Sequence, residues 1–92
     1  MKYTIRVTRR FAKDAELCKR RGYNMQLLRD AMQLLTETGT LPVQYHPHKL
    51  TGEYTGKWEC HIRPDWLMVW EPRDNEMIML FCRTGSHADL FK

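Results

Sequence analysis

Hydrophobic and polar residues alternate at the start of the chain and then recur with a helical period. Residues 2–7 alternate strictly, which predicts a β-strand. One side of this strand carries Tyr3, Ile5 and Val7. Residues 8–21 then place apolar side chains at helical spacing, and Gly22 is a suitable stop for that helix.

A second helix is predicted between Asn24, which can cap its first turn, and Gly39, which can end it. The short connection between the two helices favours an antiparallel helical hairpin. Residues 41–56 are rich in Pro and Gly and are predicted to form a loop.

Three further strands are predicted before a short helical turn that Ser86 can cap. They cover residues 57–63, 66–71 and 76–82. In the first of them, His61 falls on the side opposite to the apolar residues. The order is therefore β-α-α-β-β-β-α. This order indicates a small α+β domain over residues 1–92, with a largely antiparallel sheet and an N-terminal helical hairpin packed on it.

Composition narrows the possible environments of the protein. The 92 residues contain no apolar run long enough to cross a membrane and no signal-peptide core at the start, so we expect a cytoplasmic protein without a membrane partner. Three cysteines occur without a C-x-x-C pair, which favours buried, reduced thiols over disulfides. They are Cys18, Cys60 and Cys82.

The net charge of +4 is concentrated at the N-terminus. Residues 1–21 hold eight Lys and Arg against two acidic residues, whereas residues 22–92 hold seven against nine. Such a patch attracts a phosphate backbone or an acidic protein surface, although a solvated helix face has the same composition.

Several side chains suited to phosphate chemistry lie at predicted strand ends and turns. His61 and His87 can titrate near neutral pH, and the planar guanidinium of Arg83 suits either a phosphate or a surface ion pair. Asp65 is either a turn cap or a site carboxylate, and Trp66 is either a core residue or a stacking platform. No zinc-ligand spacing is present, so we expect no metal site.

The segments HKLTG, GKWECHIRPDW and RTGSHADLF together resemble the RelE superfamily of bacterial toxins, particularly its YafQ branch. The resemblance covers nearly the whole chain. It implies a small endoribonuclease without a cofactor that enters the A site of the 30S ribosomal subunit and cuts mRNA. It also implies a cognate antitoxin as partner, with promoter DNA bound only through the antitoxin complex.

Carried over position by position, the resemblance implies a cleavage group and two residues that contact RNA bases. The cleavage group is His48, His61, Asp65, Arg83 and His87, and the RNA-contacting residues are Trp66 and Phe91. The family motif His-Pro-Leu-x-Gly is altered here. Spacing to Leu50 and Gly52 selects His48, whereas the His-Pro dipeptide selects His46; we follow the spacing.

The hypothesis that follows is metal-independent attack of the ribose 2′-OH on the adjacent phosphate. His87 would be the general acid and either His48 or Asp65 the general base, while His61 and Arg83 stabilise the phosphate. Two alternatives remain open: a ParE-like inhibitor of DNA gyrase, and a basic nucleic-acid-binding module without turnover.

Overall fold

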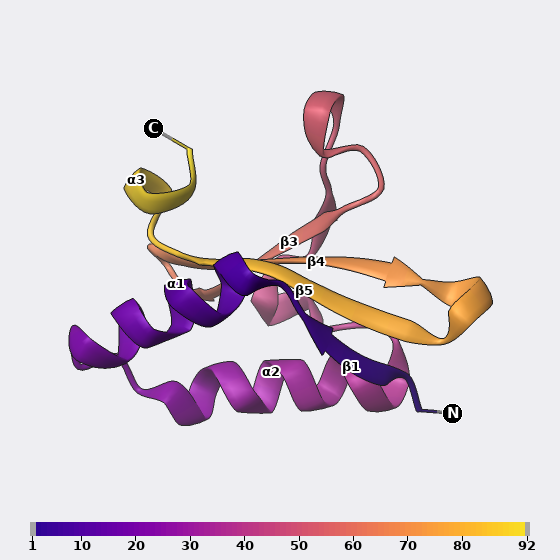
Figure 1. Cartoon of the computed structure of the whole chain (residues 1–92), viewed down its shortest axis with the longest axis horizontal. Helices are drawn as coiled ribbons and strands as arrows, with labels where there is room; N and C mark the ends of the chain where they lie inside the picture. Colours follow the sequence, from indigo (N-terminus) through magenta and orange to yellow (C-terminus); the bar gives the residue numbers. More distant parts are fainter. Residues whose placement is uncertain (1, 92) are drawn as a thin grey trace.

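The computed structural model describes residues 2–91 and contains a five-stranded sheet in the order β1-β5-β4-β3-β2 (Figure 1). β1 pairs with β5 in parallel, and all other neighbours are antiparallel, which confirms the predicted α+β, largely antiparallel fold. The strands are β1 Thr4–Val7, β2 His48–Lys49, β3 Trp58–Arg63, β4 Trp66–Arg73 and β5 Ile78–Gly85. The helices are α1 Arg9–Arg20, α2 Met25–Thr38 and α3 His87–Leu90, with short 3-10 turns η1 Val43–Tyr45, η2 Gly52–Tyr54 and η3 Asp74–Glu76.

The two long helices begin and end where the local sequence predicts. The Thr8 hydroxyl accepts a hydrogen bond from the Phe11 N–H at 3.0 Å and caps α1. Asn24 caps α2 through its side chain, and Gly39 ends it with a φ of 81°, a conformation that glycine adopts without strain. α1 and α2 run in opposite directions on one side of the sheet, whereas α3 and the loop around η2 lie on the other (Figure 1).

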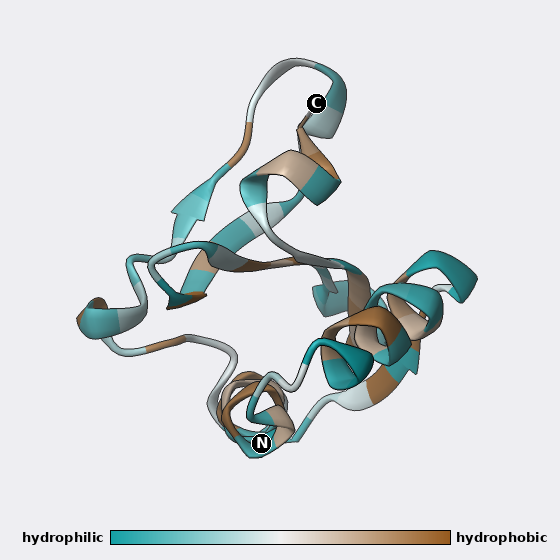
Figure 2. Cartoon of the chain, turned by 90° about the vertical axis from the view of Figure 1, so that its left-hand side faces the viewer, coloured by the Kyte–Doolittle hydropathy of each residue, from teal (hydrophilic) through white to brown (hydrophobic). Residues whose placement is uncertain are grey.

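The sheet separates a large core from a small one. The large core fills the space between the sheet and the two long helices, which carry both hydrophobic and hydrophilic segments in Figure 2. Its fully or almost fully buried residues include Phe11, Leu35, Met68, Trp70 and Phe81. The small core lies under α3 and consists of Leu67, Val69, Cys82 and Leu90. Of the functional candidates, Trp66 belongs to the large core, whereas His48, His61 and Arg83 lie on the side of the small core.

Strand bounds differ from the predictions where pairing between strands decides them. β2 was not predicted, because its two residues lie in a Pro- and Gly-rich segment and become a strand only by pairing with β3. β4 continues two residues beyond the predicted end, to Arg73, and β5 runs from Ile78 to Gly85 instead of residues 76–82. Arg83 therefore lies within β5 and not at its end.

The apolar side of β1 is only partly covered. Ile5 and Val7 are 45% and 48% exposed, although Tyr3 packs against the large core. β1 is an edge strand, and its apolar positions are less enclosed than those of the central strands.

The predicted state of the cysteines is confirmed: all three are buried and free. Burial raises the pKa of the Cys18 thiol to about 11 and also raises the pKa of Cys60. Within residues 2–91, no helix is both long and apolar enough to span a membrane.

A buried chain of hydrogen bonds joins β4 to β5, and we expect its loss to lower the stability of the protein. The Trp66 indole N–H donates to Thr84 Oγ1 at 2.9 Å, and that hydroxyl donates to the Leu67 carbonyl at 2.7 Å. Thr84→Val leaves the buried indole N–H unpaired and removes one donor to the Leu67 carbonyl, so the free energy of unfolding should fall by about 1–3 kcal/mol in urea titrations.

The double variant Trp66→Phe/Thr84→Val is the control, because it removes the indole donor together with its acceptor. Its loss should be smaller than the sum of the two single losses, since the singles share one interaction. Strict additivity would show that the Trp66–Thr84 bond contributes nothing to stability.

Candidate active site

The strand register places three of the predicted site residues on one face of the sheet. His48 pairs with Glu59, Glu59 with Val69, and Val69 with Arg83, which forms one row across β2, β3, β4 and β5. In the next row, His61 pairs with Leu67. Paired residues point to the same face, and Leu67 and Val69 belong to the small core. His48, His61 and Arg83 therefore share the face that α3 covers.

Asp65 and His87 form the central contact of the site. Asp65 Oδ1 accepts hydrogen bonds from the His87 backbone N–H at 2.9 Å and from its ring Nδ1 at 2.7 Å. The backbone bond first, and then the ring bond, lower the pKa of the Asp65 carboxyl. With Nδ1 donating to the carboxylate, the Nε2 atom of His87 is left for substrate.

His61 lies directly beside His87. The ring centroids of His61 and His87 are 5.8 Å apart, and those of His61 and His46 are 6.0 Å apart. The His61 Nδ1 atom is 3.3 Å from the Pro64 carbonyl, an acceptor, so in this arrangement Nδ1 carries the proton, and Nε2 has no hydrogen-bond partner within residues 2–91. The result is a row of three imidazoles at the end of β3.

His48 lies next to this row and is held by a carboxylate. Its Nε2 is 3.2 Å from Glu59 Oε1, and its Nδ1 is 3.1 Å from the His46 carbonyl. Both ring nitrogens thus face oxygen acceptors. The two alternatives of the altered motif occupy different places: the His46 ring contacts His61, whereas the His48 ring contacts Glu59.

Arg83 is oriented by a residue of α1. Its Nε donates to Asp14 Oδ2 at 2.7 Å and its Nη2 to Asp14 Oδ1 at 3.3 Å, while Asp14 also accepts the Thr84 N–H at 3.1 Å. The Nη1 group takes part in neither bond. Asp14 therefore fixes the plane of the guanidinium and leaves part of its donor edge for an anion.

Trp66 and Phe91 have opposite environments. Trp66 is 3% exposed and packs edge-on against Tyr23, so it has no accessible ring face on which a base could stack. The RNA-contacting role expected for Trp66 does not fit this burial. Phe91 is 41% exposed and lies against Tyr54, with ring centroids 5.8 Å apart. This aromatic pair is available at the surface.

The sequence reading overlooked two carboxylates that position cationic groups, Glu59 and Asp14. Glu59 and His61 are two residues apart in β3 and therefore lie on the same face, which the sequence already indicates. The burial of Glu59, to 7% exposure, depends on packing against other parts of the chain. Asp14 is one of only two acidic residues among the first 21, both of them in the basic helix α1.

The comparisons with known proteins identify the family of this chain. A family model described as "Bacterial toxin of type II toxin-antitoxin system, YafQ" matches residues 3–92. The chain belongs to the YafQ family. This YafQ-family chain is 35% identical over 88 residues to the mRNA interferase toxin YafQ of Escherichia coli K12, covering 95% of this chain and 94% of that relative.

Solved structures of bacterial toxins share the whole fold. The E. coli DinJ–YafQ toxin–antitoxin complex contains a chain with a TM-score of 0.90 and 32% identity, with complete coverage of both chains. A structure described as a metal-bound toxin from Helicobacter pylori has a TM-score of 0.89 and 31% identity, covering 97% of this chain and 99% of that one. Across residues 2–91 of this YafQ-family chain, no three His, Cys, Asp or Glu side chains are grouped to hold a metal ion.

The stability of α3, the helix that carries His87, depends on Asp89 and should therefore change with pH. Ser86 and Asp89 form a capping box, and Arg21 donates to Asp89 Oδ2 at 2.7 Å. The Arg21 pair, followed by the Ser86 N–H, holds the pKa of Asp89 well below its usual range. Asp89→Asn should therefore lower the free energy of unfolding at neutral pH by about 1 kcal/mol.

The pH dependence follows from the lowered pKa. The contribution of Asp89 is fully present above the unfolded pKa of about 3.9 and is lost as the pH falls toward the folded value. In urea unfolding, the gap between wild type and Asp89→Asn should stay constant from about pH 7 to 5 and narrow below about pH 4. Asp30→Asn, on the exposed side of α2, is the matched control. A gap that does not narrow in acid would contradict the assignment.

Proposed function

We propose that this YafQ-family protein is an mRNA interferase, an endoribonuclease that cuts mRNA in the A site of the 30S ribosomal subunit. The observation that carries the proposal is the Asp65–His87 pair, with the ring of His61 5.8 Å from that of His87. Two imidazoles at this separation can both reach oxygens of one phosphodiester, because general acid–base groups act within about 2.6–3.2 Å. The name of the E. coli relative, mRNA interferase, supports the same reaction class.

His87 is the general acid that protonates the departing 5′-oxygen. Asp65 binds Nδ1 and the backbone N–H of the same residue, which fixes both the tautomer and the position of the ring. Proton donation requires the imidazolium form of His87, in which both ring nitrogens carry a proton. Nδ1–H stays on Asp65, and the proton on Nε2 goes to the 5′-oxygen, which leaves the neutral imidazole. Asp65 acts on the reaction through His87 and is a positioning residue.

The general base is an imidazole and not Asp65. The Asp65 carboxylate has a lowered pKa and is already engaged by two hydrogen bonds from His87, so it is a weak proton acceptor. In the observed arrangement, the Nε2 atom of His61 has no hydrogen-bond partner among the described residues. His48 reaches the same state after releasing either Glu59 or the His46 carbonyl.

Positive charge for the phosphorane-like transition state comes from Arg83. Fixed donors of this kind contribute most when they are oriented before the reaction, which is the role of Asp14 here. Phe91 and Tyr54 provide a surface for a neighbouring base, and Trp66 supports the site from the core. No step in this scheme requires a metal ion.

The partners in this proposal are a cognate antitoxin, the ribosome and mRNA, with promoter DNA reached only through the antitoxin complex. The DinJ–YafQ complexes among the structural relatives support the antitoxin. Exposed Lys and Arg side chains on α1 fit an RNA backbone or an acidic segment of that antitoxin. The proposed site of action is the cytoplasm, where translating ribosomes are found.

Product analysis tests the reaction class. Purified protein acting on ribosome-bound mRNA should leave a 2′,3′-cyclic phosphate or 3′-phosphate and a 5′-hydroxyl. His87→Gln should reduce cleavage by about 10²–10⁴-fold because the proton donor is lost. Glu37→Gln, at an exposed residue of α2 outside the site, is the control and should leave cleavage unchanged. 5′-Phosphate ends, or intact mRNA accompanied by DNA damage, would refute the proposal.

The pH–rate profile distinguishes the two candidate bases. A base must be deprotonated, so wild-type kcat should rise with pH on the acid side of the profile. Replacement of the true base by Gln should flatten this limb, whereas replacement of the other imidazole should lower kcat and leave the limb in place. His48→Gln and His61→Gln are compared on the same message. If both variants retain the acid limb, neither imidazole is the base.

A further inference from the structure

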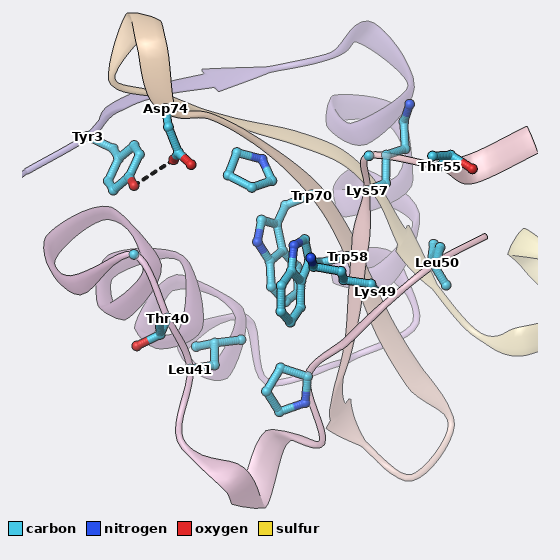
Figure 3. Close-up of a pocket in the computed structure, with 14 residues that line it drawn as sticks. Tyr3, Thr40, Leu41, Lys49, Leu50, Thr55, Lys57, Trp58, Trp70 and Asp74 are labelled. Atoms are coloured by element: carbon cyan, nitrogen blue, oxygen red, sulfur yellow. Dashed lines mark hydrogen bonds between the residues drawn. The ribbon is translucent and has the colours of Figure 1, made fainter.

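A cleft of about 740 Å³, shown in Figure 3, is lined by Trp58 and Trp70. Both indoles belong to the large-core side of the sheet, opposite to the face that carries His48 and His61. The end of α2, the segment after Pro47, the start of β3 and the β4–β5 turn surround the cleft. This volume is in the range of small-ligand sites. Nothing in the proposed reaction uses it.

Two parallel indoles form its base. The rings of Trp58 and Trp70 are stacked, with centroids 6.2 Å apart and an angle of 18° between their planes. Trp70 is 2% exposed and backs Trp58, which is only partly buried. Figure 3 shows the two rings lying side by side in the middle of the cleft. A flat, supported aromatic ring of this kind stacks well on a nucleobase.

Two lysines give this cleft a positive rim. Lys49 pairs with Trp58 in the sheet register, and its Nζ lies 5.8 Å from the centroid of that ring. Lys49 forms no ion pair among residues 2–91, whereas Lys57 lies 3.3 Å from Glu71. The acidic group at the cleft, Asp74, accepts a hydrogen bond from the Tyr3 hydroxyl at 2.8 Å.

The cleft is connected to the cleavage site through β2. His48 and Lys49 are consecutive, so their side chains point to opposite faces of the sheet. β2 is also an edge strand of only two residues, so no further strand separates the two faces of the sheet at this edge. A polynucleotide passing around this edge meets His48 on one face and Lys49 with Trp58 on the other.

We propose that this cleft binds a nucleotide of the RNA strand outside the cleaved linkage, with the base stacked on Trp58 and the phosphate on Lys49. The proposal rests on the proposed function, because it assigns a second contact to the same substrate. Trp70 stacks on Trp58, and the Lys49 ammonium lies over the Trp58 ring. A base that stacks on this ring therefore displaces the flexible Lys49 side chain toward the phosphate of the same nucleotide. Stacking is tolerant of sequence, so the cleft adds affinity more than base preference.

Binding of a 2′-O-methyl oligoribonucleotide tests the cleft apart from cleavage, since this RNA lacks the attacking hydroxyl. We expect Lys49→Gln to weaken binding and to reduce the slope of log K against log salt by about 0.7, the value for one phosphate contact on a single strand. Trp58→Leu should weaken binding by about tenfold, and Trp58→Phe should restore most of it. Lys2→Gln, at an exposed lysine outside the cleft, should change neither quantity.

An oligonucleotide with one abasic position identifies the stacked base. Wild type should lose about tenfold in affinity at one position of the abasic residue, and Trp58→Leu should lose nothing further there. Because the methylated RNA cannot be cleaved, its binding is measured independently of the cleavage mechanism, so a failed cleavage mechanism and a failed cleft give different results. Unchanged RNA affinity in both Lys49→Gln and Trp58→Leu overturns the proposal, as does a loss that affects only binding of the antitoxin.

Discussion

The antiparallel register between β4 and β5 is the constraint on which the candidate site depends. Leu67 is paired with Gly85. Two residues before Leu67 the chain reaches Asp65, and two residues after Gly85 it reaches His87, so the register brings this pair into contact across the end of the two strands. A slip of one residue would turn each side chain to the other face and separate them.

Gly85 makes the turn from β5 into α3 possible. Its φ is 151°, and a Cβ at this position would come within 2.8 Å of Asp89 Oδ2 and 3.1 Å of Leu90 Cδ1. A glycine is therefore required for α3 to fold back onto the sheet with its capping box intact. Because α3 has only four residues, its position depends on this turn, on Arg21 and on the burial of Leu90.

Three cationic or titratable side chains at the site are each held by a carboxylate from a different part of the chain. Asp65 precedes β4 and holds His87, Glu59 in β3 holds His48, and Asp14 in α1 holds Arg83. In each case the carboxylate fixes the orientation of its partner and binds only some of the nitrogen atoms of that partner. The large core on the other side of the sheet contains none of these ion pairs. Most of the apolar packing and the candidate catalytic groups therefore lie on opposite faces of the sheet.

Local sequence determined much of the architecture. Capping residues and glycines defined the two long helices, and alternation identified β3 and the face of His61, because these signals act between residues close in the chain. The motif segments identified the family and most of the proposed site. Neither β2 nor the length of β5 could be predicted in this way, since each depends on a partner strand.

Only the tertiary structure decided which candidate residues meet, because those contacts join distant segments through register and packing. It buried Trp66, which sequence alone left open between core and surface, and it brought His46 next to His61. It also showed that the carboxylates of Asp14 and Glu59 orient Arg83 and His48. The sequence thus determined which chemical groups are available, and the pairing of the strands determined which of them can act together.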